Sequence, residues 1–192
     1  MASEPPGPAL RHASPSLTWD EPPRRFALAL RLAGSAAFGP LPRSSPSLGG
    51  AIAGVWPRVR LELAAGYHLP QEMQRSDGQG AQFDAWMAAT RACPRWRVQP
   101  IEAQLCAVLH GGAIRGSGRG LAENRTSRRP WLGLGGGFAA TWHPVRAFGL
   151  WIGVDTLAMV IRPRFVATHL GELHRSGPLA VRGGAGIEWV FL

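Results

Sequence analysis

Residues 179–192 read LAVRGGAGIEWVFL, and this stretch decides the fold. Side chains alternate between the two faces of a β-strand. One face here carries Leu179, Val181, Gly183, Ala185, Ile187, Trp189 and Phe191, and the other carries Ala180, Arg182, Gly184, Gly186, Glu188 and Val190. The pattern predicts a strand with one apolar face and a second face of small residues that holds two opposite charges.

Similar alternation recurs in seven upstream segments, of which the second, residues 48–56, is rich in Gly and Ala and poorly phased. They cover residues 26–39, 48–56, 59–68, 83–92, 101–110, 131–142 and 148–160, separated by clusters of Gly, Pro, Ser and Arg. The sequence contains no apolar run of 18 or more residues, which excludes an ordinary transmembrane helix but not a barrel, whose strands need only about ten alternating residues each. We therefore predict an all-β chain in which residues 26–192 form an eight-stranded antiparallel up-and-down transmembrane β-barrel. Residues 1–25 are rich in Pro, and we expect them to form a disordered leader.

The lengths of the expected connections favour a membrane barrel. The connections after the first, third, fifth and seventh segments are long, whereas those after the second, fourth and sixth are short turns. Outer-membrane barrels have this asymmetry, with long loops outside the cell and short turns in the periplasm.

Charged residues lie in the middle of the segments, on the face opposite the apolar one. That face is otherwise Gly and Ala, which suits a narrow lumen in which opposite charges pair. We predict a lumen charge network of Arg31, Arg60, Glu62, Asp84, Glu102, Asp155, Arg182 and Glu188. For the fourth segment this assigns Asp84 and the other even-numbered residues to the interior.

Tryptophans cluster near the ends of the expected strands. Aromatic girdles mark both membrane interfaces of a barrel, although Trp also packs in ordinary β cores. We favour a girdle made of Trp56, Trp96, Trp131, Trp142 and Trp189.

The terminal run Gly183–Leu192 resembles the C-terminal strand of outer-membrane β-barrels. The resemblance covers about residues 26–192 and is to the eight-stranded OmpA/OmpX type. It implies that Ile187, Trp189 and Phe191 form the signal read by the barrel-assembly machinery, and that the chain lies in a bacterial outer membrane in contact with its lipid, as a monomer. Two features depart from the family pattern, because Leu192 follows the final aromatic residue and the chain has a single Tyr.

Residues 1–25 lack the apolar core of a secretory signal, which conflicts with export. Three explanations stay open: the true start lies upstream of Met1, the chain is the C-terminal part of a longer product, or the export prediction is wrong.

Cys93 and Cys106 flank the turn between the fourth and fifth segments. If that turn centres on Gln99 and Pro100, the two cysteines lie directly across from one another, where a disulfide is feasible. We favour the disulfide over two free thiols. It would require the oxidising periplasm, and with even-numbered residues inward it would also require a bulge near Pro94.

Composition and motifs favour neither nucleic-acid binding nor catalysis. The net charge of +9 comes from 21 basic residues that are all Arg, which indicates a biased codon pool as much as phosphate chemistry, and no recognition helix or zinc pattern accompanies them. The six histidines show no metal-ligand spacing, and the sequence has no nucleophile elbow, phosphate loop or HExxH motif. We expect no enzymatic activity, no cofactor, no metal and no nucleic-acid partner.

Arginines in the expected long connections suggest a surface partner. Bidentate hydrogen bonds would join them to lipopolysaccharide phosphates, although simple solvation of the loops explains them equally well. These residues are Arg43, Arg75, Arg115, Arg119, Arg125, Arg128, Arg129 and Arg175.

The favoured function is a structural or surface-interaction barrel whose charge-paired lumen conducts little or nothing. One alternative is a soluble calycin-like barrel that binds an apolar molecule, in which Leu28, Leu61, Leu105, Leu150 and Ile187 would point inward. A basic nucleic-acid-binding β domain is the other. The direction in which these apolar residues point distinguishes the two barrel hypotheses, because they face outward in a membrane barrel and inward in a soluble one.

Overall fold

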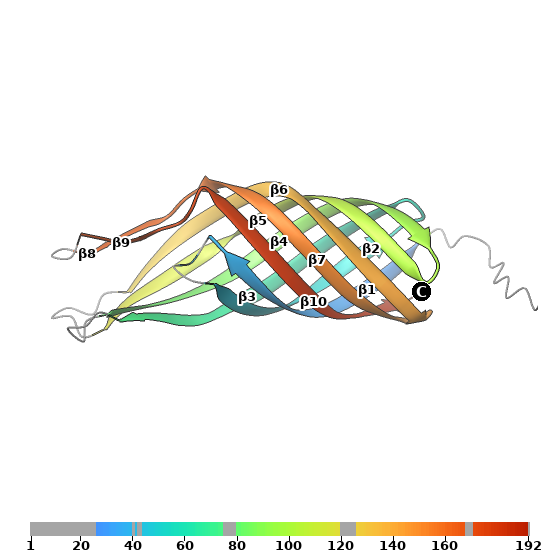
Figure 1. Ribbon diagram of the computed structural model, residues 1–192, viewed down its shortest axis with the longest axis horizontal. Coiled ribbons are helices and arrows are strands. Elements are labelled where there is room, and N and C mark those ends of the chain that lie inside the picture. Colours follow the sequence, from blue (N-terminus) through green and yellow to red (C-terminus); the bar gives the residue numbers. More distant parts are fainter. Residues whose placement is uncertain are drawn as a thin grey trace, which may run out of the picture.

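The computed structural model describes residues 26–39, 41, 44–74, 80–119, 126–167 and 171–191. Eight antiparallel strands close into a barrel in the order β1-β10-β7-β6-β5-β4-β3-β2 (Figure 1). Their bounds are β1 (Ala27–Phe38), β2 (Ser45–Val55), β3 (Val59–Gln74), β4 (Gly80–Val98), β5 (Ile101–Arg119), β6 (Thr126–Val145), β7 (Phe148–Ile161) and β10 (Leu179–Phe191). The predicted all-β, eight-stranded barrel is confirmed. Within the described part of the chain, no helix has the length and apolarity needed to cross a membrane.

The connections alternate in length, as the sequence predicts. We call the end of the barrel at which β1, β3, β5 and β7 finish the long-loop end, and the end with residues 56–58, 99–100 and 146–147 the short-turn end. The chain from β7 to β10 contains a separate hairpin of β8 (Arg164–Ala167) and β9 (Gly171–Arg175), which projects beyond the barrel in Figure 1.

Four strands are longer than their alternation indicates. Residues 70–74 and 80–82 continue β3 and β4 as a paired ladder, and residues 115–119 and 126–129 do the same for β5 and β6. The sequence assigns these residues to loops. Apart from Met73 and Ala81, both faces of this extension carry polar residues, proline or glycine, so the period-two signal of a half-buried strand is weak although the backbone ladder continues.

The apolar stripes face outward. Leu28, Leu61 and Leu105 are 50%, 49% and 55% exposed, and Leu150 is also exposed, whereas Arg60 and Glu62 on the opposite face are 1% and 3% exposed. Ile187 is partly exposed on the same outer face. The soluble alternative requires these apolar side chains inside the barrel, and the structure contradicts it.

The orientation predicted for β4 is wrong. Phe83 and Met87 point into the lumen and are each 1% exposed, while Trp86 is 53% exposed on the outside. Asp84 therefore lies on the outer face and not in the lumen network, and its carboxylate accepts a hydrogen bond from the Tyr67 hydroxyl. The error arises because both faces of this segment are apolar, so alternation alone does not show which one faces lipid.

The inward apolar side chains fill the lumen toward the long-loop end. Phe83 and Met87 form a continuous buried cluster with side chains from four other strands, β5, β6, β7 and β10, and with Leu41 from the first long connection. The large members of this apolar plug are Leu41, Phe83, Met87, Ile114, Trp131, Leu157 and Met159. The charged side chains occupy the remainder of the lumen, toward the short-turn end.

Candidate functional site

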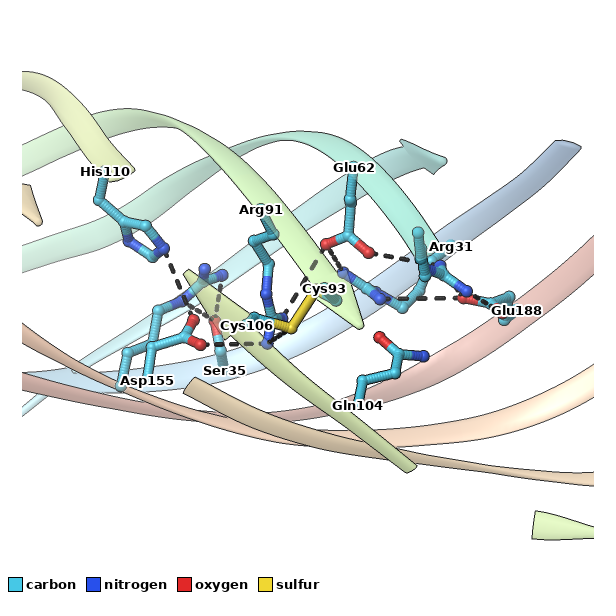
Figure 2. A network of polar contacts seen from close by, with 12 residues as sticks. Arg31, Ser35, Glu62, Arg91, Cys93, Gln104, Cys106, His110, Asp155 and Glu188 are labelled. Atoms are coloured by element: carbon cyan, nitrogen blue, oxygen red, sulfur yellow. Dashed lines mark hydrogen bonds and ion pairs between the residues drawn. A yellow bond between two sulfur atoms is a disulfide. The ribbon is translucent and has the colours of Figure 1, made fainter. Parts of the chain in front are cut away.

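Four charged side chains form a closed ring inside the barrel (Figure 2). Arg60 donates from Nη1 and Nη2 to the two carboxylate oxygens of Glu188, at 2.8 and 2.5 Å. Its Nη2 is also 3.3 Å from Glu62 Oε2. Arg31 Nη2 donates to Glu62 Oε1, and Arg31 Nη1 lies 3.8 Å from Glu188 Oε2. Each cation thus contacts both anions, which is the pairing that lets buried charges offset their desolvation.

This ring links strands that are not neighbours in the barrel wall. Arg60 lies on β3 and Glu188 on β10, and β2 and β1 separate these two strands in the barrel order. The ion pair therefore spans the lumen and does not run along the wall. Its geometry depends on the closure of the barrel.

A second group crosses the lumen beside the ring. Arg91 Nη2 on β4 lies 3.1 Å from Asp155 Oδ1 on β7, and β5 and β6 separate these strands. His110 Nε2 is 3.5 Å from the other carboxylate oxygen of Asp155. Arg91 Nη1 also lies 4.0 Å from Glu62 Oε1, so the second group is continuous with the ring.

Trp151 forms one side of both groups. The Arg31 guanidinium carbon lies 3.9 Å from the centre of the Trp151 ring, and that of Arg91 lies 5.6 Å away. A cation above an aromatic face is attracted by the ring quadrupole, most strongly where water is excluded. Small neighbours make room here, because a Cβ at Gly153 would meet the indole ring and a Cβ at Gly137 would meet the Asp155 carboxylate.

A third group lies near the short-turn end. Arg95 Nη2 donates to Glu102 Oε2, and Gln104 Nε2 donates to Glu102 Oε1 at 2.9 Å. His143 Nε2 lies 3.9 Å from the same carboxylate. Glu102 is thus surrounded by donors from β4, β5 and β6.

Six of the eight predicted network residues are held in these ion-paired groups: Arg31, Arg60, Glu62, Glu102, Asp155 and Glu188. Arg182 also faces inward, but it donates to Ser35 Oγ, and Asp84 lies outside the barrel. Sequence reasoning missed Arg91, Arg95, His110 and Trp151. The reversed orientation of β4 hid Arg91 and Arg95, because it placed odd-numbered residues on the lipid face.

Cys93 and Cys106 form a disulfide in the lumen wall, and the prediction is confirmed. Their Cα atoms are 4.1 Å apart, and both side chains point inward. The β4–β5 register is unbroken from Gly80 to Val98, so the expected bulge near Pro94 is absent. Odd-numbered residues of β4 face inward throughout, which removes the need for it.

Apart from the disulfide, the site is a set of paired charges. Among the described residues, no group of three His, Cys, Asp or Glu side chains is placed to hold a metal ion. Each carboxylate in the three groups accepts from or contacts at least one arginine. The arrangement can hold the walls together and obstruct the lumen.

No family model matches the sequence, and no curated protein matches it. Solved structures do match. Neisserial surface protein A is 15% identical with a TM-score of 0.58, covering 88% of this chain and 99% of that protein. A major outer membrane protein of Thermus thermophilus is 10% identical with a TM-score of 0.60, covering 86% of this chain and 100% of that protein. Ail of Yersinia pestis, in complex with the heparin analogue sucrose octasulfate, is 10% identical with a TM-score of 0.54, covering 86% of this chain and 97% of that protein.

The chain has the fold of the eight-stranded outer-membrane barrels. Identities of 10–15% establish this fold and nothing finer. Within the outer-membrane barrel fold, the aromatic side chains that were predicted to form girdles divide into two groups. Trp56, Trp96 and Trp142 are exposed near the short-turn end, and Trp189 packs edge-on against Phe148.

The prediction that Trp131 belongs to the aromatic girdle is wrong. It lies in the apolar plug and is 3% exposed. Odd-numbered residues of β6 face inward, which places Trp131 on the lumen side. On the outer face near the long-loop end, the exposed aromatic residues include Phe38 at the end of β1, and Tyr67 and Trp86, which are register partners on β3 and β4.

Two of the predicted surface arginines are direct neighbours on the outside of the barrel. Arg115 on β5 and Arg128 on β6 are register partners, and both are exposed. Along their strands, each lies two residues closer to the long-loop end than the residue in register with Trp86. Arg129 is also exposed. Arg43, Arg75 and Arg125 fall outside the described residues, as do the side chains of Arg119 and Arg175.

Proposed function

We propose that this chain is an outer-membrane protein of a Gram-negative bacterium that has a structural or surface-interaction role and conducts little or nothing. The observation that carries the proposal is that ion pairs cross the lumen from β3 to β10 and from β4 to β7. An ion moving through the barrel would have to break these pairs. It would then have to enter the apolar plug, where an unpaired charge is strongly disfavoured.

The outward stripe supports a membrane location. Large apolar side chains such as Leu63, Ile52 and Ile152 are each more than half exposed. In water, a continuous apolar surface of this kind leads to association, whereas acyl chains solvate it. The residues on which the C-terminal signal depends, Ile187, Trp189 and Phe191, lie on that outer face of β10. We propose that the barrel-assembly machinery binds them and that the barrel acts as a monomer.

The extension beyond the barrel supports a surface role. At the long-loop end, β3, β4, β5 and β6 stay paired up to Gln74, Gly80, Arg119 and Thr126 respectively. In contrast, β7 pairs only with the part of β6 that begins at Leu132. Residues 126–131 of β6 therefore have no β7 partner on that side. An open strand edge of this kind can pair with an incoming strand.

Arg115 and Arg128 support lipopolysaccharide as a surface partner. Like charges directly opposite each other on a sheet destabilise it. Asp84, the register partner of Arg115 on β4, offsets part of this repulsion, and an anion bound beside Arg128 would offset the rest. Guanidinium groups bind phosphates through paired hydrogen bonds. Ail, which has the same fold, was solved with a polysulfated heparin analogue.

Two measurements test the proposal separately. Cells that express the full upstream reading frame are fractionated, and the mobility of unheated and boiled samples is compared on gels. We expect the protein in outer-membrane fractions with a heat-dependent shift, and a cytosolic protein without the shift would overturn the location.

The purified barrel is then inserted into planar bilayers and its current is recorded at both polarities. We expect no unitary openings above the lipid baseline. A matched variant, Arg60→Ala with Glu188→Ala, removes the main pair that crosses the lumen and tests whether this pair contributes to the block. Regular openings of the unmodified barrel would contradict a closed lumen, whatever its location.

A further inference from the structure

A small cavity lies in the lumen between the two groups of ion pairs. Its volume is about 30 Å³. A buried space of roughly 10–15 Å³ on this measure holds one water, so the cavity has room for about two water-sized species. Its charged lining residues are Arg31, Glu62, Arg91, Asp155 and Arg182.

The cavity lining carries an excess positive charge. Three arginines face two carboxylates, whereas Arg60 and Glu188 neutralise each other beside it. Among the described residues, the ion pairs of Glu62 and Asp155 go to Arg31, Arg60, Arg91 and His110. None goes to Arg182, although Asp155 is its register partner on β7. The Arg182 guanidinium instead donates from Nε and Nη2 to the neutral Ser35 Oγ, at 3.0 and 2.8 Å.

Three buried donors and one buried acceptor in the same lining have no hydrogen-bond partner, and the acceptor is Asp155 Oδ1, which lies 3.1 Å from Arg91 Nη2. Arg31 Nη1, Arg91 Nε and Trp151 Nε1 are buried with no acceptor in hydrogen-bond range, and their residues are 4–6% exposed. All three are donors in every protonation state that these side chains adopt near neutral pH. Burying a donor without an acceptor is unfavourable, so such sites normally hold a bound water or ion.

We propose that this cavity binds a monovalent, halide-sized anion, which in the cell is chloride. The excess guanidinium charge requires a counter-ion, and the three unpartnered donors outnumber the one unpartnered carboxylate oxygen, so the lining lacks an acceptor. The volume suits a single atom of halide size and is too small for a phosphate or sulfate with four oxygens. The inference goes beyond the proposed function, because it depends neither on conduction nor on the cellular location.

Ser35 offers a matched pair of variants. Ser35→Asp places a carboxylate beside Arg182 and supplies the missing negative charge from within the chain, and the hydroxyl of Ser47, 2.7 Å from Ser35 Oγ, can still donate to it. Ser35→Asn adds similar volume without charge. We expect the Asp variant to lose anion binding and the Asn variant to retain it.

Two readouts test the site. Crystals of the full chain grown in bromide should show anomalous density in the cavity of the unmodified protein and of Ser35→Asn, but not of Ser35→Asp. Urea unfolding in lipid bilayers at constant ionic strength should show stabilisation by chloride over gluconate. The folded-to-unfolded ratio should rise about 100-fold when chloride reaches 100 times its dissociation constant, and Ser35→Asp should show no chloride dependence.

The opposite results are equally clear. A cavity that contains only water density in bromide crystals, or a folded state that is equally stable in chloride and gluconate, overturns the proposal. A chloride effect that persists unchanged in Ser35→Asp also overturns it, because the anion would then bind elsewhere. None of these results bears on whether the lumen conducts.

Discussion

Glu188 is the residue whose loss the lumen should tolerate least. Its carboxylate accepts hydrogen bonds from both terminal nitrogens of Arg60, and its Oε2 lies 3.8 Å from Arg31 Nη1. We expect Glu188→Gln to destabilise the folded barrel by about 3–5 kcal/mol, because removing one partner leaves a buried arginine uncompensated. Urea unfolding in bilayers, followed by tryptophan fluorescence, measures this loss.

Glu72→Gln provides the control for that measurement. Glu72 is exposed on the extension of β3 at the long-loop end, where an interaction of a charged side chain contributes about 0–1 kcal/mol, so the same change of chemistry there should alter stability by at most about 1 kcal/mol. Equal effects of the two substitutions would show that the ring contributes nothing particular to stability.

Two glycines provide a steric test of the same site. A Cβ at Gly137 would collide with the Asp155 carboxylate, whereas a Cβ at Gly183 would meet nothing within 4 Å. We expect Gly137→Ala to cost about 1–3 kcal/mol, as overpacking does in other well-packed interiors. Gly183→Ala should be neutral or stabilise the strand by up to about 1 kcal/mol. Comparable destabilisation by both substitutions would show that the space beside Asp155 is not what constrains position 137.

At the scale of the element, the β4–β5 hairpin is joined twice, by its backbone ladder and by the Cys93–Cys106 bond. A disulfide that closes a loop of about 15 residues contributes roughly 3 kcal/mol by restricting the unfolded chain. We expect reductant to lower the unfolding free energy of the barrel by about that amount. The double variant Cys93→Ser, Cys106→Ser should start at the lower value and be insensitive to reductant.

Alkylation checks the bond directly. The denatured, unreduced protein should take up no iodoacetamide by mass, and it should take up two equivalents after reduction. Labelling of unreduced protein purified from the oxidising compartment would contradict the disulfide.

The outward apolar surface is a property of the whole molecule, and depth along the barrel tests it. Leu63 lies mid-strand on β3 and is 57% exposed, and Leu179 begins β10 at the long-loop end and is 62% exposed. An arginine on the lipid face costs about 2–4 kcal/mol at the bilayer midplane and about 0–1 near the interface. We therefore expect Leu63→Arg to destabilise the bilayer-inserted barrel by the larger amount and Leu179→Arg by the smaller.

Equal and small effects of these two substitutions would contradict a lipid-facing surface. The measurement is urea unfolding in bilayers of defined thickness. In detergent micelles, which adapt to a charge, the difference should shrink.

Apart from the β8–β9 hairpin, which it did not predict, the amino-acid sequence by itself determined the eight barrel strands, the alternating lengths of the connections and the pairing of Cys93 with Cys106. These features depend on local rules, namely the period of two along a strand and the geometry of a short turn. The sequence also placed most of the charged residues on the correct face, because in those strands only one face is apolar.

Only the tertiary structure decided which charges meet. Arg60 and Glu188 are 128 residues apart, and their contact depends on the stagger and diameter of the closed barrel, which no local pattern encodes. The closed barrel also decided the orientation of β4 and the inward position of Trp131. Both faces of β4 are apolar, so the choice between them depends on what fills the lumen, and that is a property of all eight strands together.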